Sequence, residues 1–300
     1  MKIVSLTGKP YTGEGTSIAL GMFDGVHIGH RRIISAAKNK STEIGIPASV
    51  LLFSESPHGA SELLPLSDRL CELEALGVDF VFVYDFEEIK GLSPIEFVKG
   101  ELFEKLGAKA VSAGYNYRFG AKAAGDSEML TSLAKECGIE CEIVGRVDAL
   151  GDAVSSTRIR ELLANGDVET ANDLLGYEYY LKNEVVHGKE LGRQMGIPTA
   201  NLFFHDKAAS LAHGIYYTKT EIDEKEYISV SNVGIRPTVE NTERVNLETH
   251  ILDFDGDVYG KTVKVRFCGR GRGERTFENV DALKKEIATD CQRARDFFEK

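Results

Sequence analysis

GMFDGVHIGH, residues 21–30, is the stretch that decides how the first half of this chain folds. A short apolar run, 17–20, precedes it, and a segment with helical periodicity begins at 31, so the order predicts a strand, a glycine turn and a helix. His27 and His30 then stand where the helix starts, beside unpaired backbone N–H groups and the positive end of the helix dipole. A helix start of this kind favours anions.

The two histidines admit three interpretations. Imidazoles at a helix start can donate hydrogen bonds to phosphoryl oxygens as charge develops, and Gly25 and Gly29 leave the backbone bare enough for a phosphate chain to approach. The histidines can instead cap the helix or pack against it. A zinc pair is the third interpretation, and it is weakened because no third ligand is near in the sequence. We favour the phosphate site.

The rest of the first half alternates apolar runs with helical segments. Strands are predicted at 48–53, 80–84 and 109–113, and helices from Ser67 to Gly77 and from Ser93-Pro94 onward. This alternation predicts an α/β layer with a mostly parallel sheet, in which ligands bind beyond the carboxyl ends of the strands. Because His27 and His30 follow the first predicted strand and Asn116 follows the fourth, these side chains can converge.

Two further segments of this half carry candidate binding residues. Asn116 lies in the aromatic, glycine-bounded segment 114–120, which predicts either a pocket for a flat ligand or a hydrophobic plug beneath a loop. Ser155, Ser156 and Thr157 stand at the start of another predicted helix, with Arg160 one turn inside it. That pattern predicts a second anion-binding helix end, or only an N-cap with a solvated arginine.

Beyond Gly176 the segments become alternating and separated by turns. The predicted strands are 179–186, 214–222, 225–233, 245–252 and 262–267, and a helix is predicted over 280–298. The pattern indicates an antiparallel, barrel-like module covered by one helix, with a domain boundary near 177–182.

Within this second half, Gly188, Gly192 and Gly196 are spaced four residues apart and lead to Pro-Thr-Ala-Asn at 198–201. Bare backbone suits a loop that closes over phosphates, with the Thr199 hydroxyl and the Asn201 amide oxygen at Mg²⁺. A glycine-rich hairpin is the alternative. Glu248 shares a strand face with Asn246 and His250, so it is either a general base in the mouth of the barrel or part of a solvated face.

Length and composition bound the class of protein. The 300 residues suggest two domains, and a net charge of −11 disfavours binding to nucleic acid or to an anionic membrane. The five cysteines form no paired pattern, which indicates reduced thiols. The amino terminus lacks the apolar core of a signal peptide, and no apolar run reaches the length of a membrane span. We therefore expect a cytoplasmic protein with small-molecule substrates; nothing in the pattern indicates its oligomeric state.

Taken together, residues 15–298 resemble the bifunctional bacterial FAD synthetases, which combine riboflavin kinase with FMN adenylyltransferase. The resemblance implies a Rossmann-like nucleotidylyltransferase domain over 1–178, followed by an antiparallel β-barrel riboflavin kinase domain with a carboxyl-terminal helix over 179–300. It implies that ATP and Mg²⁺ serve both steps, from riboflavin to FMN and from FMN to FAD.

The resemblance also assigns roles to residues of this sequence. His27, His30 and Arg160 would act on the ATP phosphates during adenylyl transfer, and Glu248 would be the general base of the kinase. Thr199 and Asn201 would hold the Mg²⁺–nucleotide. The remaining implied binding residues are Phe23, Asp24, Gly25, Gly29, Asn116, Ser155, Ser156, Thr157, Gly188, Gly192 and Gly196.

Two alternative functions stay open at this point. One is a single-activity enzyme whose other half has become a scaffold. The other is a regulator that binds a flavin or nucleotide without catalysis. A binding protein has no need of a general base such as Glu248, which argues against the regulator.

Overall fold

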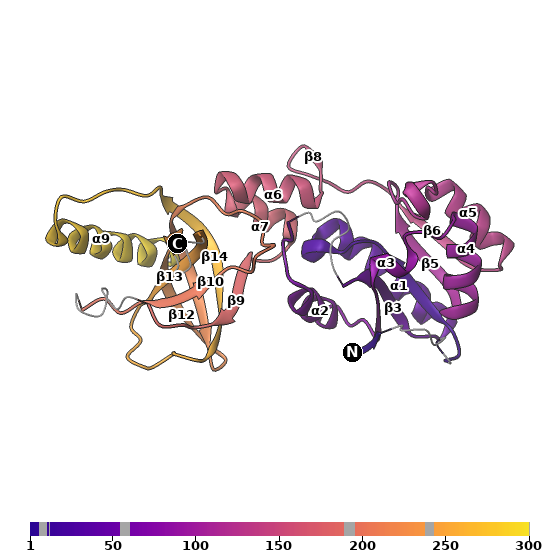
Figure 1. Ribbon diagram of the computed structural model, residues 1–300, viewed down its shortest axis with the longest axis horizontal. Coiled ribbons are helices and arrows are strands. Elements are labelled where there is room, and N and C mark those ends of the chain that lie inside the picture. The colour runs from indigo at the N-terminus through magenta and orange to yellow at the C-terminus, as the bar shows by residue number, and fades with distance from the viewer. Residues whose placement is uncertain (6–10, 12, 55–60, 189–195, 238–242, 300) are drawn as a thin grey trace. The chain divides into compact units, whose positions relative to one another are not determined.

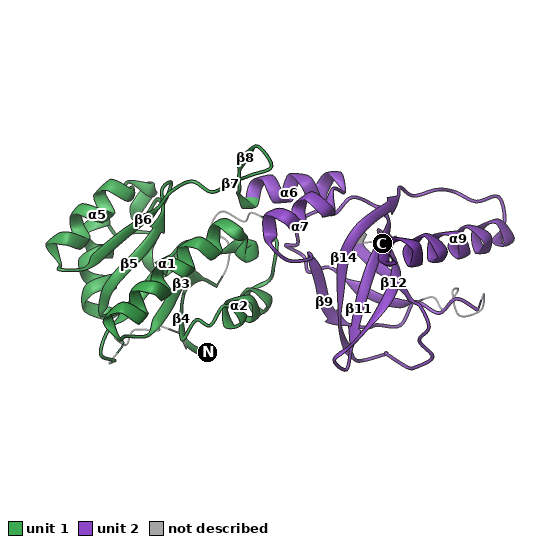
Figure 2. Cartoon of the chain, turned by 180° about the vertical axis from the view of Figure 1, so that it is seen from behind, with its two compact units in different colours: residues 1–156 green, residues 157–300 purple. Residues whose placement is uncertain are grey.

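The computed structural model describes residues 1–5, 11, 13–54, 61–188, 196–237 and 243–299. The chain divides into two compact units, residues 1–156 and 157–300, shown in two colours in Figure 2. Each unit has its own sheet, and each is described by itself.

The first unit is built on a six-stranded parallel sheet in the order β1-β4-β3-β2-β5-β6. The strands are β1 (Lys2–Ser5), β2 (Thr16–Leu20), β3 (Ala48–Phe53), β4 (Phe80–Tyr84), β5 (Ala108–Gly114) and β6 (Glu140–Val144). The predicted parallel sheet is confirmed. Strand β1 was not predicted: it is a short edge strand with Ile3 exposed, and an edge strand needs no continuous apolar run.

Both faces of this sheet are covered, which explains the apolar runs of its strands. Helices α1 (Ile28–Ile44) and α2 (Leu66–Ala75) contribute Ile33, Ile34 and Leu73 to one core, together with Ala19 of β2. Ile18 and Leu20 point to the other core, which includes residues of α3, of the π-helix η3 and of α5. That side carries α3 (Phe86–Ile89), α4 (Pro94–Glu96), η3 (Phe97–Lys105) and α5 (Ser127–Glu136). Figure 1 shows this layering.

The strand order places a topological switch point at β2. Strand β2 pairs with β3 on one side and with β5 on the other, so the chain winds outward in both directions from there. In open parallel sheets, ligands bind at the carboxyl ends of the strands beside such a point. The 21–30 segment follows β2, and Asn116 follows β5. The two segments therefore leave the ends of neighbouring strands, and the convergence of their side chains stays a prediction.

Short elements join this sheet to the barrel. A two-stranded hairpin, β7 (Asp148–Ala149) and β8 (Asp152–Ala153), precedes α6 (Ser156–Asn165) and α7 (Val168–Leu175). The side chain of Asp167 caps α7 by accepting the Thr170 N–H, and Gly176 ends it with φ at 78°. The hairpin was not predicted.

The second unit is a six-stranded antiparallel sheet in the order β10-β13-β12-β11-β14-β9. Its strands are β9 (Tyr180–Glu184), β10 (Ala200–Phe203), β11 (Gly214–Ile222), β12 (Lys225–Pro237), β13 (Glu243–Ile251) and β14 (Thr262–Arg272). Val186, two residues after β9, forms an isolated bridge with Asn201 of β10, which nearly closes the sheet into a barrel. Helix α9 (Val280–Phe298) packs on β11, β12 and β14 as predicted, with Ala294 buried.

The interior of the barrel is partly polar. Aromatic rings gather around Phe267, among them Tyr216 with a centroid 5.5 Å away. Beside them, Thr218 Oγ1 lies 2.8 Å from the hydroxyls of both Ser229 and Ser231, and Ser231 lies 2.9 Å from Thr249. These hydroxyls are fully buried and satisfy one another, as buried polar groups must.

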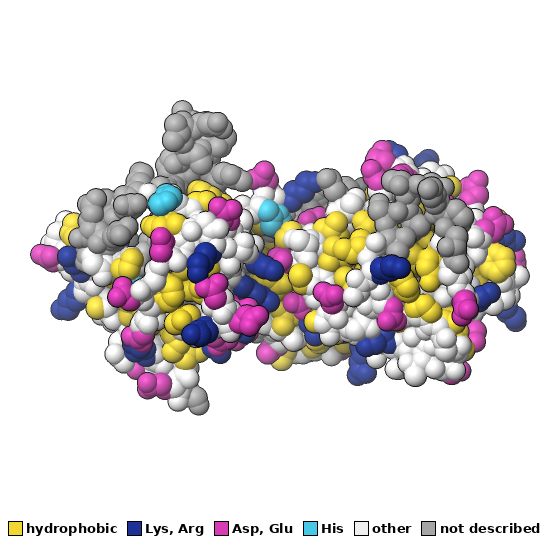
Figure 3. Space-filling view, turned by 90° about the horizontal axis from the view of Figure 1, so that it is seen from below, with side chains coloured by type: hydrophobic (Ala, Val, Ile, Leu, Met, Phe, Trp, Pro, Cys, Tyr) yellow, Lys and Arg dark blue, Asp and Glu magenta, His cyan; other side chains and the backbone are white. Residues whose placement is uncertain are grey.

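The surface mixes both signs of charge. On the face shown in Figure 3, Lys and Arg side chains are interspersed with Asp and Glu, in a chain of 36 basic and 47 acidic residues. Of the helices in the described ranges, none has the length and apolarity needed to cross a membrane.

Candidate active sites

The turn before α1 has an unusual backbone. Phe23 and Val26 have φ angles of 49° and 40°, and Gly25 between them has 74°. The left-handed region is uncommon for residues with a side chain and rarest for β-branched ones such as Val26. The turn ends at His27, which returns to φ −63° and ψ 170° and forms the N-cap of α1. The left-handed backbone therefore fixes the direction in which His27 enters the helix.

His27 and His30 lie face to face. Their ring centroids are 3.6 Å apart with 14° between the ring planes. The ring centroids of Phe23 and His30 are 5.2 Å apart. His27 Nδ1 accepts the His30 backbone N–H at 3.3 Å, so the neutral His27 ring carries its proton on Nε2. The cap and the predicted anion site are thus compatible: one nitrogen caps the helix and the other keeps an N–H.

Burial, and then the neighbouring His27, lower the pKa of His30 well below its ordinary value. His30 Nδ1 is buried and has no hydrogen-bond partner among the described residues. A neutral imidazole still donates one N–H. A polyphosphate beside it would supply the negative charge that favours the imidazolium. The pair is therefore suited to receiving an anion.

The neighbours of the turn hold it in place. The Asp24 carboxylate accepts the Leu63 N–H at 2.9 Å, and the Asp24 carbonyl accepts the Ser156 hydroxyl at 3.0 Å. A Cβ at Gly29 would lie 3.1 Å from the His27 ring, so glycine there leaves room for the imidazole. The structure thus brings together Phe23, Asp24, Gly25, His27, Gly29, His30 and Ser156.

Asn116 is exposed in the turn after β5. A Cβ at Gly114 would lie 3.3 Å from Asn116 Oδ1 and 3.4 Å from Ile33 of α1, so this turn lies against the histidine-bearing helix. Phe119 is buried and stacks on Tyr117 with centroids 5.7 Å apart. The buried Phe119 supports the interpretation as a plug, and the binding pocket at Asn116 stays a prediction.

Ser155, Thr157 and Arg160 stand where the sequence predicts a helix start. Ser155 directly precedes α6, and Arg160 lies one turn inside it and is half-buried. Thr157 and Arg160 fall in the range of the second unit. Their binding of phosphate therefore stays a prediction.

A second candidate site lies on the barrel around Asn246. Its Nδ2 donates to Asn201 Oδ1 at 3.3 Å and to Glu248 Oε1 at 3.2 Å, which joins β10 to β13. Asn246 is 3% exposed and its Oδ1 has no hydrogen-bond partner among the described residues. The sequence placed Asn246 on the face of Glu248 but did not identify it as a site residue. Its role depends on the cross-strand register of Asn201 with Glu248.

Glu248 lies on the outer face of the barrel and not in its mouth. Its neighbours in the chain, Leu247 and Thr249, are fully buried and point to the interior filled by Phe267 and the hydroxyls, so strand alternation turns Glu248 outward. The prediction of a shared face with Asn246 is confirmed; of the two interpretations of Glu248, its exposure agrees with a solvated face, and its role as a general base stays a prediction. The carboxylate is exposed, as a group that meets substrate from solvent requires.

The turn into β10 is fixed by close contacts. A Cβ at Gly188 would lie 2.5 Å from Asn201 Nδ2, so the bare backbone of Gly188 covers the amide. His250 Nδ1 donates to the Pro198 carbonyl at 2.8 Å, and Asn201 Nδ2 lies 3.5 Å from the Thr199 carbonyl. Gly196 has φ at 77°. Gly192 lies outside the described residues.

The groups around Asn201 fit a hard cation. They offer amide, carboxylate and hydroxyl oxygens, which Mg²⁺ prefers, and Asn246 Oδ1 is a buried acceptor that no described residue supplies with a donor. By contrast, the described ranges hold no cluster of three His, Cys, Asp or Glu side chains that could bind a metal, so the zinc interpretation of His27 and His30 gains no third ligand.

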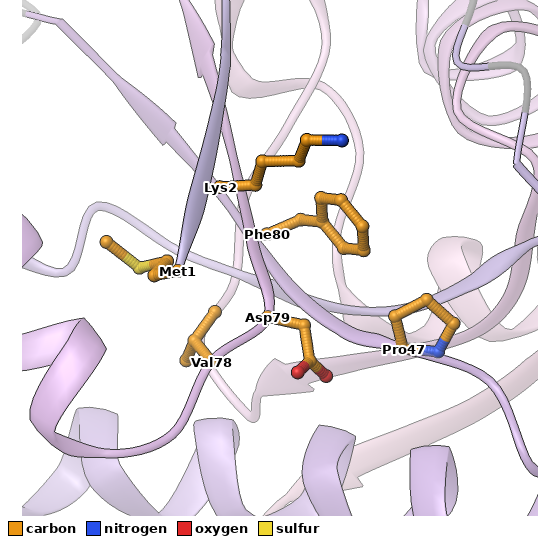
Figure 4. Close-up of a pocket in the computed structure, with 6 residues that line it drawn as sticks. All are labelled: Met1, Lys2, Pro47, Val78, Asp79 and Phe80. Atoms are coloured by element: carbon orange, nitrogen blue, oxygen red, sulfur yellow. The ribbon is translucent and has the colours of Figure 1, made fainter.

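A pocket lies at the end of the first sheet where the strands begin, opposite to the end that carries the histidines. Figure 4 shows the residues that line it: Met1, Lys2, Pro47, Val78, Asp79 and Phe80. The cavity volume is about 520 Å³. These residues are at the amino ends of β1, β3 and β4. Since ligands of parallel sheets bind at the carboxyl ends, we assign no substrate to this pocket.

Two different architectures in one chain thus each carry a candidate phosphate-handling site. Paired imidazoles stand at the switch point of a parallel sheet, and amide oxygens stand beside a carboxylate on an antiparallel barrel. This combination is typical of one class of protein, the two-domain transferases that use ATP.

Comparison with known proteins identifies the family. A family model described as FAD synthetase matches residues 9–158, and one described as riboflavin kinase matches residues 175–298. The bifunctional riboflavin kinase/FMN adenylyltransferase of Haemophilus influenzae is 35% identical over 95% of both chains. That of Listeria monocytogenes is 34% identical over 100% of this chain and 99% of its own. The chain belongs to the bifunctional riboflavin kinase/FMN adenylyltransferase family.

A solved structure supports the fold along the whole chain. A Streptococcus pneumoniae protein described as a macrolide-efflux protein superposes with a TM-score of 0.88 at 30% identity, over 98% of this chain and 99% of that one. The efflux activity in that description refers only to the Streptococcus pneumoniae protein.

Proposed function

We propose that this chain phosphorylates riboflavin to FMN with ATP in its barrel and adenylylates FMN to FAD with a second ATP at its parallel sheet. The observation that carries the proposal is the presence of two separate sites: the stacked His27 and His30, and the Asn201–Asn246–Glu248 cluster. We assign the adenylyltransferase to residues 1–178 and the kinase to residues 179–300.

In adenylyl transfer, a phosphate oxygen of FMN attacks the α-phosphorus of ATP. The bond from the α-phosphorus to the bridging oxygen breaks, and pyrophosphate leaves. The nucleophile is already ionised, so no general base is needed, and the protein contributes positioning and charge stabilisation. His27 and His30 donate to the phosphate oxygens, Arg160 and the N–H groups after Ser155 bind the chain of phosphates, and Asn116 faces the flavin.

In the kinase step, the terminal hydroxyl of the ribityl chain attacks the γ-phosphorus. Glu248 accepts the proton of that hydroxyl, the bond to the β-phosphate oxygen breaks, and ADP leaves. Asn246 orients Glu248 through its amide N–H, at 3.2 Å in the structure. A proton acceptor placed this way contributes about 10²–10⁴-fold to the rate.

Thr199 and Asn201 would hold Mg²⁺ with the nucleotide, and Asn246 orients the Asn201 amide that does so. When bound, the ion neutralises charge on the phosphates during transfer. The backbone of Gly188 keeps the Asn201 amide in place by excluding a side chain there. We also propose a cytoplasmic location, because all five cysteines are free, which fits a reducing compartment.

Incubation of the protein with riboflavin and MgATP, followed by chromatography of the products, tests this function. We expect FMN and FAD, with ADP and pyrophosphate as the nucleotide products. FMN alone, or FAD formed only from supplied FMN, would indicate a single-activity enzyme. Binding of flavin without any product would indicate a regulator.

A further inference from the structure

The left-handed turn before His27 is held by charged side chains from outside it. A residue with a side chain is strained in the left-handed region, because its Cβ comes too close to the following carbonyl oxygen. Such a conformation persists only where the surroundings over-determine it. Phe23 and Val26 are both in this region, and Val26 immediately precedes His27. The contacts that hold the turn therefore decide where the imidazole goes.

Arg31 of α1 and Glu72 of α2 hold the end of the turn. Arg31 Nε donates to the Val26 carbonyl at 3.1 Å, and its Nη2 donates to Glu72 Oε2 at 3.1 Å. The two side chains are 28% and 15% exposed, so the pair is partly shielded from water. A guanidinium is a rigid fork, and fixing one arm on Glu72 fixes the direction of the other toward Val26.

Arg69 of α2 holds the start of the turn. Its Nη1 donates to the Met22 carbonyl at 3.4 Å, and Nη2 lies 3.8 Å from Glu62 Oε1. The side chain is 1% exposed, while Nε and Nη2 have no hydrogen-bond partner among the described residues. Burial lowers the pKa of Arg69, and the carboxylates of Glu62 and Asp24 oppose that shift. Burying a charge with so few hydrogen bonds costs free energy, so this arginine is weak evidence for a purely stabilising role.

We propose that Arg69 and the Arg31–Glu72 pair are positioning residues for adenylyl transfer. They fix the carbonyls of Met22 and Val26, and the turn between them delivers His27 to the N-cap of α1 and His30 to its face. None of the three side chains meets the reacting atoms. The inference rests on the proposed function, because it concerns the geometry of the histidines that act on ATP. A misplacement of about 1 Å can lower a rate by about 10²-fold.

The test uses substitutions in α2 with matched controls. Arg69→Met removes the buried charge, Arg69→Lys keeps it without the fork, and Glu72→Gln removes the charge that holds Arg31 with little change in volume. The controls are Arg32→Met, at an exposed arginine of α1, and Glu74→Gln, at a carboxylate of α2 whose side chain is 62% exposed. All variants are assayed as full-length protein for FAD formation from FMN and for FMN formation from riboflavin.

We expect kcat for FAD formation to fall about tenfold or more in Arg69→Met and several-fold in Glu72→Gln, with the KM for FMN nearly unchanged. Arg69→Lys should recover part of the loss, and both controls should match the wild type. Riboflavin phosphorylation should stay unchanged throughout, since its site is on the barrel.

Temperature separates positioning from simple stabilisation. A deficit caused by unfolding disappears when the assay is run well below the thermal transition, whereas a positioning deficit persists there. Wild-type kcat in Glu72→Gln and Arg69→Met in the cold would overturn the inference while leaving the proposed function intact. If Arg69→Met does not fold, Glu72→Gln decides the question by itself. A wild-type protein that forms no FAD from FMN would overturn both.

Discussion

Single residues decide the geometry of both candidate sites, and Gly188 shows this most directly because it has no side chain. Its backbone lies against the Asn201 amide, and a Cβ would come within 2.5 Å of Asn201 Nδ2. Gly188→Ala should therefore displace the amide and reduce FMN formation by about tenfold or more, as a misplaced ligand does. FAD formation from supplied FMN should be unchanged and serves as the internal control. Equal FMN formation by variant and wild type would remove Asn201 from the kinase site.

His30 makes the stability of the protein depend on pH. Burial and His27 lower its pKa in the folded state, whereas in the unfolded chain it titrates near its ordinary value of about 6.5. As the pH falls through that value, the unfolded state gains a proton that the folded state does not accept. The free energy of unfolding should then fall by up to about 1.4 kcal/mol per pH unit until the folded pKa is reached.

Urea unfolding of the wild type and of His30→Gln at pH 7 and pH 5 measures this contribution. The substitution removes the titrating group, so His30→Gln should lose less stability than the wild type on acidification. Parallel losses in the two proteins would show that His30 does not contribute.

Residues whose role is local could be predicted from the sequence. Gly29 and the N-cap histidine act within a few positions of each other, and their spacing is visible in the chain. Asn246 and Arg69 could not be found this way. Asn246 becomes a site residue only through the register that sets Asn201 beside Glu248, and Arg69 reaches Met22 across 47 positions.

At the scale of elements, the hydroxyls inside the barrel carry a testable cost. Thr218 bonds to Ser229 and Ser231, all three fully buried, and joins β11 to β12. Thr218→Val keeps the shape but removes one hydrogen bond from each serine, which keeps its bond to Thr220 or Thr249, so the loss of stability should be about 1 kcal/mol. The exposed Thr262→Val is the matched control and should stay within about 0.5 kcal/mol of the wild type. Chemical unfolding of both variants measures the difference; equal stabilities would show that the hydroxyl network contributes nothing.

Helix and strand signals were reliable where a cap or an apolar run is explicit. Ser93 and Glu96 form a capping box at the predicted helix start. The continuation of that helix as a π-helix over Phe97–Lys105 has no comparable signal in the sequence. Alternation likewise predicts polar residues facing outward, and the hydroxyls of β11 and β12 reverse this by bonding to each other inside the barrel.

At the scale of the whole molecule, the central claim is that one chain carries two independent ATP-dependent sites. The sequence predicts both halves because each has its own periodicity: apolar runs between helices in one and alternating strands in the other. The family matches fall on these halves separately, at residues 9–158 and 175–298. Because the two sites lie on separate sheets, a substitution in one site should abolish only the activity of that site.

Product analysis of two variants tests this claim most directly. His30→Ala, given riboflavin and MgATP, should form FMN and no FAD. Glu248→Ala should form no FMN from riboflavin but should form FAD when FMN is supplied. Loss of both activities from one of these substitutions, in a protein whose circular dichroism and melting temperature match the wild type, would contradict the account.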